Sequence, residues 1–247
     1  MNIRQYLDST YLKTASQAGL DEDQNTVVVK KFIQEAIEEN FKLIMIRPNM
    51  VSIAKEMMDT AYSKVGIGTV IDFPNGNSSI EEKLIEATRA IQDGADDLDF
   101  VCNYNAFIVG DVDLVKEEVL KGTQLGLENG KVVKWIIEVA ALNDKQIIQL
   151  SALIKNVVVS NFKEIFYNSV FVKSSTGFFI TQGGLPNGAT ISTITMMLEN
   201  AFPLPVKAAG GVRTYEEAVT MIQLGVKRIG TSGAKIIANG AGTQLEY

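Results

Sequence analysis

Short apolar segments alternate with longer amphipathic segments along this 247-residue chain, and this alternation constrains its fold more than any other feature. A repeated strand–helix order favours parallel strands joined by crossover helices. Eight segments qualify as strands, which is the number that closes a (β/α)8 barrel. The predicted strands are Leu7–Thr10, Leu43–Arg47, Gly66–Phe73, Leu98–Asn103, Val133–Val139, Val170–Ser174, Val206–Ala209 and Arg228–Thr231.

Apolar residues at helical spacing fall between most of these strands. Thr214 is followed three residues later by Glu217, a capping box that marks the start of a helix. A doubly wound open sheet shows the same alternation, but no GxGxxG motif follows the first strand, which disfavours its dinucleotide-binding form. The predicted helices are Val27–Asn40, Ile80–Gly94, Asp111–Leu127, Asp144–Val157, Thr190–Ala201 and Thr214–Leu224.

The sequence therefore predicts one α/β domain, a TIM barrel over residues 1–247, with a flexible glycine-containing tail over about residues 240–247. The net charge is -6, and the basic residues are scattered among more numerous acids, which disfavours nucleic acid as a partner. The amino-terminal residues lack the apolar run of a signal peptide, and no segment approaches the ~20 apolar residues of a membrane span. We therefore expect a cytoplasmic protein without a membrane partner.

The chain contains no histidine and a single cysteine, Cys102. A Ser-His-Asp triad is impossible, and zinc sites are disfavoured because their usual ligands are His and Cys. A carboxylate-built magnesium site stays open. Lysine is then the natural residue for carbonyl chemistry, and we expect neither a metal nor a cofactor.

Charged residues lie in the most apolar predicted strands, near the ends where barrels place their catalytic groups. These residues are Asp99, Glu138, Lys173 and Lys207. Lys173 and Lys207 are on consecutive strands and should be neighbours. Burial and a nearby like charge both favour the uncharged amine, which is the form that attacks a carbonyl. A carboxylate such as Asp99 can then move protons.

Ordinary internal ion pairs are the alternative interpretation of any one of these charges. Two lysines and two acids together favour a site. A second indication of a site, here for phosphate, comes from two glycine-containing loops. They contain Gly210 and Gly211 after the seventh strand and the Gly230–Gly233 segment at the eighth. Barrels often bind phosphate at these two loops, although tight turns that need positive φ would also use glycine.

At these residues the sequence resembles the deoxyribose-phosphate aldolase family. The segment Phe171–Phe178, F-V-K-S-S-T-G-F, resembles the family's F-V-K-T-S-T-G-F and is highly specific. The resemblance implies that Lys173 is the Schiff-base lysine. Val206–Thr214 resembles the family's K-A-A-G-G-I-R segment, which implies that Lys207 is the second active-site lysine.

Further segments extend the resemblance over nearly the whole chain. Gly94–Val101 resembles G-A-D-E-I-D-M-V, which places the proton-relay aspartate at Asp99. Leu7–Lys13 resembles D-H-T-L-L-K, and we expect Asp8 and Thr10 there to contribute to substrate and phosphate binding.

Two more segments complete the match. Val70–Pro74 resembles V-I-G-F-P, and Arg228–Ser232 matches R-I-G-T-S, a phosphate-binding turn. The resemblance implies that phosphate contacts Gly177, Gly210, Gly211, Gly230 and Ser232.

The chain departs from the family pattern at three places. Ser9 stands where many members have histidine, Asp72 replaces a common glycine, and the segment Phe179–Asn187 is longer than in compact members. Further candidate site residues are Glu138, Arg47 and the terminal Tyr247, since some relatives end in a tail whose tyrosine reaches the site. Members often dimerise, so a homodimer is expected.

The resemblance implies reversible cleavage of 2-deoxy-D-ribose 5-phosphate to glyceraldehyde 3-phosphate and acetaldehyde, in deoxyribonucleotide catabolism. The residues by themselves support lysine-dependent carbonyl chemistry on a phosphorylated substrate. A class I aldolase or transaldolase-like protein with another donor, and a barrel that only binds sugar phosphates, are the alternatives.

Overall fold

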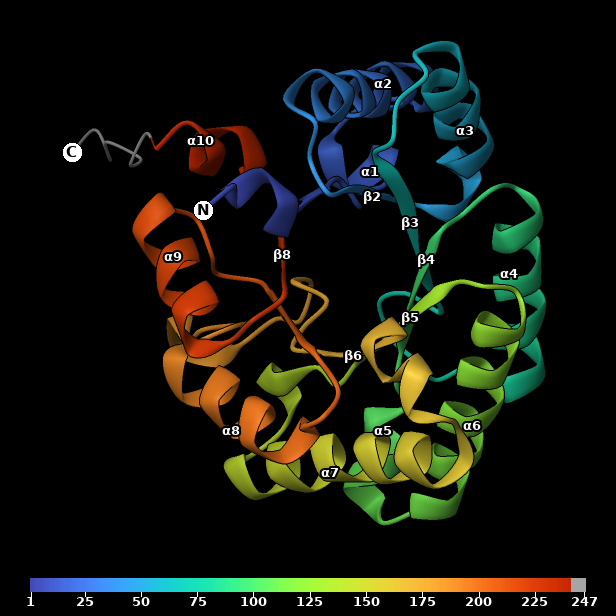
Figure 1. Ribbon diagram of the computed structural model, residues 1–247, viewed down its shortest axis with the longest axis vertical. Coiled ribbons are helices and arrows are strands. Elements are labelled where there is room, and N and C mark those ends of the chain that lie inside the picture. Colours follow the sequence, from blue (N-terminus) through green and yellow to red (C-terminus); the bar gives the residue numbers. More distant parts are fainter. Residues whose placement is uncertain (241–247) are drawn as a thin grey trace.

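The computed structural model describes residues 1–240, which form a closed barrel of eight parallel strands surrounded by helices (Figure 1). Each strand pairs with the next in sequence, and the first pairs with the last. The strands are β1 (Leu7–Thr10), β2 (Leu43–Ile46), β3 (Gly66–Ile71), β4 (Asp97–Val101), β5 (Val132–Ile136), β6 (Val170–Lys173), β7 (Val206–Ala209) and β8 (Arg228–Thr231).

The helices form a ring outside the barrel, with the amino-terminal turn and the last helix in contact (Figure 1). The α-helices are α1 (Ala15–Ala18), α2 (Glu22–Glu39), α3 (Val51–Thr60), α4 (Ile80–Gln92), α5 (Tyr104–Val109), α6 (Val112–Glu128), α7 (Asp144–Asn161), α8 (Ile191–Ala201), α9 (Tyr215–Leu224) and α10 (Ala234–Ala238). Short 3-10 turns are η1 (Ile3–Tyr6), η2 (Pro48–Met50), η3 (Val139–Ala141), η4 (Glu164–Ser169) and η5 (Gln182–Gly184).

The predicted barrel and its eight strands are confirmed, but five strands end earlier than expected. Two of them end one residue early, the second at Ile46 and the sixth at Lys173. The third, predicted to reach Phe73, ends at Ile71, and the fifth, predicted to reach Val139, ends at Ile136. The reason is a left-handed backbone after each strand, with φ of 53° at Asp72 and 54° at Glu138. An extended strand cannot continue through that conformation. The fourth strand ends at Val101 instead of residue 103.

The predicted helices omit α1, α3, α5 and α10, and the predicted α2 begins too late. In α3, Val51, Ala54 and Met58 are buried at helical spacing. The start of α2 is set by Asp21, whose side chain accepts from the Gln24 N–H in a capping box. The polar first turn hides this start from a search for apolar periodicity.

Side chains along β5 point alternately to the outer helices and to the inside of the barrel. Trp135 faces the helices, stacks on Phe100 with ring centroids 4.9 Å apart, and donates from Nε1 to Thr123 Oγ1 at 3.0 Å. Its neighbour Lys134 faces the opposite way and contacts Asp99 inside the barrel. Adjacent residues of a strand point to opposite faces, so one apolar segment carries both core and site residues.

The barrel interior is divided into an apolar and a charged part. Leu43, Met45 and Val70 form a small apolar cluster on β2 and β3. Gly68 lies beneath them, and a Cβ there would lie 2.5 Å from the terminal carbon of Met45. Strands β1 and β4 to β8 instead supply buried acids and bases. The acidic and basic side chains are therefore confined to one side of the interior.

None of the helices within residues 1–240 has the length and apolar composition to cross a membrane.

Candidate active site

Lys173 and Lys207 lie side by side near the carboxyl-terminal ends of β6 and β7, where they are register partners. Both ammonium groups donate to the same carboxylate oxygen, Asp99 Oδ2, at 2.8 Å from Lys173 Nζ and 2.9 Å from Lys207 Nζ. All three side chains are buried. The predicted adjacency of the two lysines is confirmed, and Asp99 lies between them.

The environment of Lys173 favours its uncharged amine. Burial and the positive charges of Lys207 and Lys134 lower the pKa of Lys173, whereas the charge of Asp99 raises it. Together these influences lower the pKa of Lys173 to about 8. At pH 7, roughly a tenth of the molecules then carry the free amine, against well under a thousandth at the ordinary lysine pKa of about 10.4. A buried free amine is the nucleophile of Schiff-base chemistry.

Asp99 keeps its charge despite complete burial. Burial by itself raises the pKa of Asp99, but Lys134, Lys173 and Lys207 together outweigh it and hold that pKa well below its ordinary value. The carboxylate is thus an acceptor shared by three ammonium groups. This geometry lets Asp99 orient the lysines and pass a proton from one to another.

Sequence reasoning missed the residues that complete this charged network. Lys134 Nζ contacts Asp99 Oδ1 and Asp97 Oδ2, both at 2.7 Å. Arg228 lies at the start of β8 and reaches Asp97 Oδ2 at 3.2 Å. The signal in the sequence was a charged residue at an inward position of an apolar strand, as in V-V-K-W-I. Both residues lie away from the carboxyl-terminal strand ends, where catalytic groups are expected.

Asp8 and Thr10 lie near this network on β1. Asp8 is fully buried, with Oδ2 at 2.6 Å from Lys207 Nζ and Oδ1 at 2.7 Å from Arg228. A carboxylate in this place would repel a phosphate group, so Asp8 does not suit the expected phosphate contact. Its contacts fix Lys207 instead. Thr10 donates from Oγ1 to the Asp8 carbonyl at 2.9 Å.

Glu138 connects β5 to the loop that follows Lys173. Its Oε2 accepts from the N–H of Thr176 at 3.2 Å and from the Thr176 hydroxyl, which in turn accepts from the N–H of Phe178 at 3.0 Å. These contacts lie on either side of Gly177. Burial outweighs these hydrogen bonds and raises the pKa of Glu138.

The loops after β6 and β7 meet at their glycines. Gly177, Gly210 and Gly211 have φ of 81°, 76° and 91°, so each needs the left-handed conformation that the turn interpretation anticipated. The contact is also close: a Cβ on Gly188 would lie 2.3 Å from the Gly210 carbonyl oxygen, and one on Gly210 would lie 3.7 Å from Gly177 Cα. The loop after β6, which carries Gly177, therefore contacts the predicted phosphate loop after β7.

The two predicted phosphate residues from the eighth strand region have different surroundings. A Cβ on Gly230 would lie 3.2 Å from Lys207 Cε, so glycine leaves room for the lysine side chain. Ser232 is exposed in the connection between β8 and α10.

Arg47 holds several loops together at the same end of the barrel. It donates to the carbonyls of Leu12 at 2.8 Å and Phe73 at 3.1 Å, and its guanidinium lies 4.8 Å from the Phe73 ring centroid. These contacts account for its position after β2. Ser9, which stands where many family members have histidine, is fully buried, and its hydroxyl has no hydrogen-bond partner in residues 1–240.

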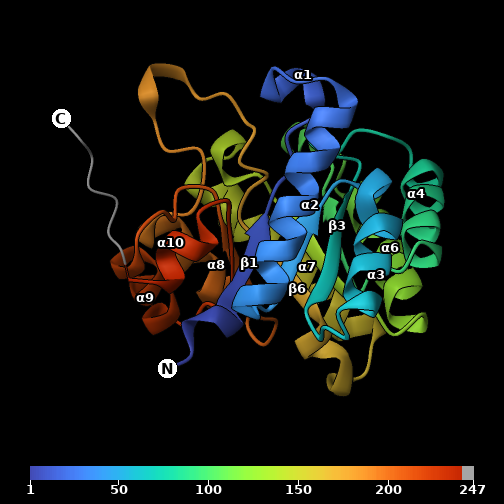
Figure 2. The ribbon, with the colours of Figure 1, turned by 90° about the horizontal axis from the view of Figure 1, so that it is seen from above.

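The long segment after Lys173 stands out from the barrel on the side of α1 (Figure 2). Ile180 is 91% exposed, and η5 lies within this loop. The extra residues therefore extend the loop outward. Tyr247 falls outside the described residues. Within residues 1–240, no three His, Cys, Asp or Glu side chains are grouped as metal ligands.

A closed (β/α)8 barrel with a buried amine of lowered pKa, paired with a second lysine and an aspartate, defines a Schiff-base type of aldolase site. The chain belongs to the DeoC/LacD family of aldolases, whose profile matches residues 7–240.

Relatives support the same family over most of their lengths. The chain is 37% identical over 242 residues to the deoxyribose-phosphate aldolase of Thermococcus gammatolerans, covering 98% of this chain and 97% of the relative. It is 34% identical over 241 residues to that of Caldicellulosiruptor saccharolyticus, covering 96% and 97%. The tetrameric deoxyribose phosphate aldolase of Aeropyrum pernix has a similar structure, with a TM-score of 0.77 and 26% identity over 96% of this chain and 89% of that one.

Proposed function

We propose that this chain is a class I aldolase that reversibly cleaves 2-deoxy-D-ribose 5-phosphate to D-glyceraldehyde 3-phosphate and acetaldehyde, in deoxyribonucleotide catabolism in the cytoplasm. The observation that carries the proposal is the buried Lys173 amine, with a pKa of about 8, which shares the carboxylate of Asp99 with Lys207. The relatives named for this activity support the choice of substrate.

In the cleavage direction, the free amine of Lys173 adds to the C1 aldehyde of the open-chain sugar, and water leaves to give an iminium. Loss of the C3 hydroxyl proton breaks the C2–C3 bond and releases glyceraldehyde 3-phosphate. The electron pair of the broken bond passes to the iminium and forms an enamine. Protonation at C2 and addition of water then release acetaldehyde. Asp99 and Lys207 move these protons.

The loops after β6, β7 and β8 bind the phosphate of the substrate in this proposal. The left-handed glycines of the first two loops let N–H groups approach the anion closely. The proposed phosphate residues are Gly177, Gly210, Gly211, Gly230 and Ser232, with Thr10 beside them. Asp8 and Glu138 act as positioning residues, Asp8 for Lys207 and Glu138 for the Gly177 loop.

The remaining proposals concern the whole chain. Residues 1–247 act as one barrel domain, and the chain forms a homodimer, although the relative from Aeropyrum pernix is a tetramer. Tyr247 contributes from the tail, which Tyr247→Phe tests through a fall in the turnover of the phosphorylated sugar.

Covalent trapping tests the function directly. The protein is incubated with acetaldehyde, reduced with borohydride, and digested for mass spectrometry. We expect an ethyl group on Lys173 alone, and loss of the adduct in Lys173→Met with a fall in kcat/KM of at least about 10³-fold. Lys55→Met, which changes an exposed lysine, is the control. Trapping of dihydroxyacetone phosphate without acetaldehyde would contradict the proposed donor.

A further inference from the structure

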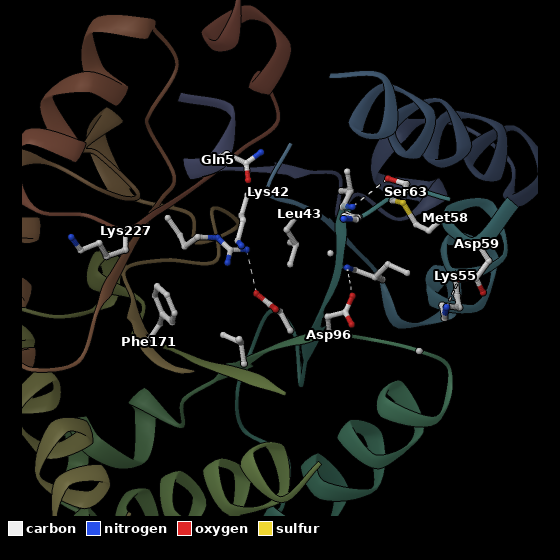
Figure 3. A pocket seen from close by; sticks show the side chains of 18 of the residues that line it. Gln5, Lys42, Leu43, Lys55, Met58, Asp59, Ser63, Asp96, Phe171 and Lys227 are labelled. Atoms are coloured by element: carbon white, nitrogen blue, oxygen red, sulfur yellow. Dashed lines mark hydrogen bonds and ion pairs between the residues drawn. The ribbon is translucent and has the colours of Figure 1, made fainter. Parts of the chain in front are cut away.

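A cavity of about 660 Å³ opens at the amino-terminal end of the barrel, opposite the end where Lys173 lies (Figure 3). Its walls come from the starts of strands, including Lys42 before β2, Gly66 in β3 and Lys227 before β8. Small-molecule sites typically measure ~300–1,000 Å³, so the volume is large enough for a ligand. The catalytic loops do not contribute to it.

Basic side chains outnumber acidic ones in the lining, although the chain as a whole carries a net charge of -6. Five basic residues face three acidic ones, a formal excess of two positive charges. The basic residues are Lys42, Lys55, Lys64, Lys227 and Arg228, and the acidic residues are Asp59, Asp96 and Asp97. A concave positive region in an acidic protein attracts anions.

The acidic side chains of the cavity already have partners. Lys55 and Asp59 pair on the right of Figure 3, Asp97 contacts Arg228 at 3.2 Å, and Asp96 Oδ2 accepts from a backbone N–H at 2.9 Å. Three ammonium groups have no carboxylate within 4.0 Å in the described part of the chain. They belong to Lys42, Lys64 and Lys227.

We propose that this amino-terminal cavity binds a phosphate ester of sugar size, separately from the catalytic end of the barrel. Ammonium groups bind phosphate as point charges, and three unpaired lysines line this cavity. Gln5 and Asn168 in the lining supply amide groups for the hydroxyls of a sugar.

A line of contacts leads from this cavity to the catalytic amine. Arg228 contacts Asp8 at 2.7 Å, and Asp8 contacts Lys207 at 2.6 Å. Lys207 contacts Asp99 at 2.9 Å, and Asp99 contacts Lys173 at 2.8 Å. A dianion beside Arg228 favours the protonated form of Lys173, so occupancy slows Schiff-base formation at neutral pH. This effect on Schiff-base formation rests on the proposed function, whereas binding of a phosphate ester in the cavity does not.

Lysine footprinting tests the binding site without any catalytic step. Surface lysines are acetylated with a limiting reagent in the presence of sodium pyrophosphate or of sodium chloride at equal ionic strength, and the sites are quantified by mass spectrometry. We expect pyrophosphate near saturation to reduce acetylation by roughly fivefold at the cavity lysines. These are Lys42, Lys64 and Lys227, and the outer-face Lys116 and Lys121 are the internal controls. Equal acetylation in both salts would overturn the site while leaving the aldolase proposal intact.

A double variant separates this cavity from the phosphate loops. In Lys42→Gln/Lys227→Gln, both changed residues are exposed and outside the catalytic network, so cleavage without pyrophosphate should be unchanged. Calorimetric titration of the unaltered protein with pyrophosphate should show one more binding site than the variant. Pyrophosphate should also slow acetaldehyde trapping on Lys173 more in the unaltered protein. Identical stoichiometry in the two proteins would refute the inference.

Discussion

The pKa of Lys173 depends on side chains from three other strands. Asp99 comes from β4, Lys134 from β5 and Lys207 from β7, and each acts on the amine through charge. Burial is the largest influence and lowers the pKa, while Asp99 opposes it. The pKa of about 8 therefore records a balance, in which burial and the two neighbouring cations together outweigh Asp99.

Replacing Lys207 tests this balance of influences on the pKa of Lys173. In Lys207→Met, the removal of one neighbouring cation leaves Asp99 more effective at stabilising the charged amine, so the pKa of Lys173 rises above about 8. The rate of acetaldehyde trapping, measured between pH 6 and 10, should reach its plateau at a higher pH. A rise of about one in this pKa would reduce the free amine at pH 7 by about tenfold. A plateau at the same pH would contradict the assigned influence of Lys207.

The second prediction separates positioning from proton transfer at Glu138. Glu138→Ala removes the acceptor of the Thr176 N–H and hydroxyl, so the Gly177 loop loses its anchor. Loss of about 1.5–3 kcal/mol from charged hydrogen bonds predicts a rise in KM for the phosphorylated sugar of roughly tenfold or more.

The control substrate for this prediction is unphosphorylated 2-deoxyribose, whose kcat/KM should stay within about twofold because it makes no phosphate contact. Glu138→Gln keeps an amide oxygen that accepts from Thr176, so its KM should rise less than that of Glu138→Ala. An equal loss with both sugars would show that Glu138 acts on the reacting atoms.

At the scale of elements, glycines set the distances between neighbouring segments. Helix α6 approaches β5 so closely that a Cβ on Gly126 would lie 2.2 Å from Val133 Cγ2, and one on Gly122 would lie 2.8 Å from the Trp135 ring. This contact holds the strand that carries Lys134. The absence of a Cβ at Gly122 and Gly126 therefore sets how closely α6 approaches β5.

Gly126→Ala should therefore destabilise the protein although alanine favours helices. Overpacking costs about 1–3 kcal/mol, against a gain in helix propensity of ~0.8–1.0 kcal/mol. Urea unfolding measures the net change. The double variant Gly126→Ala/Val133→Ala removes the clashing methyl groups, and a coupling energy near zero in the resulting cycle would contradict the proposed contact.

The whole molecule encloses a charged network in its barrel. Asp8, Asp97 and Asp99 lie among Lys134, Lys173, Lys207 and Arg228, and most of these side chains are completely buried. A buried charge that loses its partner is strongly destabilising, by about 3–5 kcal/mol. The network therefore makes folding depend on the ionisation of its aspartates.

Acid unfolding tests this dependence. Burial raises the pKa of Asp8 and Asp99, but the surrounding cations outweigh it and hold both below the ordinary value. Their contribution to stability is complete above the unfolded pKa of about 3.9 and is lost as the pH falls toward the lowered folded pKa.

The expected result is a free energy of unfolding that decreases below about pH 4. Asp99→Asn should lose part of this slope, and Asp59→Asn, which changes an exposed ion pair, should retain it. Unfolding curves at each pH measure the slopes. If the free energy of unfolding falls as steeply with pH in Asp99→Asn as in the unaltered protein, Asp99 is not a source of the acid destabilisation.

Much of the barrel could be predicted because its signals are local. Each strand is a short apolar run, and the carboxyl-terminal ends of parallel strands meet at one end, which brought Lys173, Lys207 and Asp99 together from sequence order alone. The contacts of Lys134 and Arg228 were not predictable in this way. They depend on the register of neighbouring strands, which pairs Asp99 with Lys134, and on the approach of Arg228 to Asp97 across the interior, and strand order specifies neither.

The sequence by itself determined the eight-strand alternation, the family and the lysine chemistry, because hydrophobic period and short motifs are properties of neighbouring residues. Only the tertiary structure decided the pKa of Lys173, the contact of Asp8 with Lys207, and the basic cavity at the amino-terminal end. Each of these arises from charges that are distant in sequence and near in space, and electrostatic energy depends on that distance.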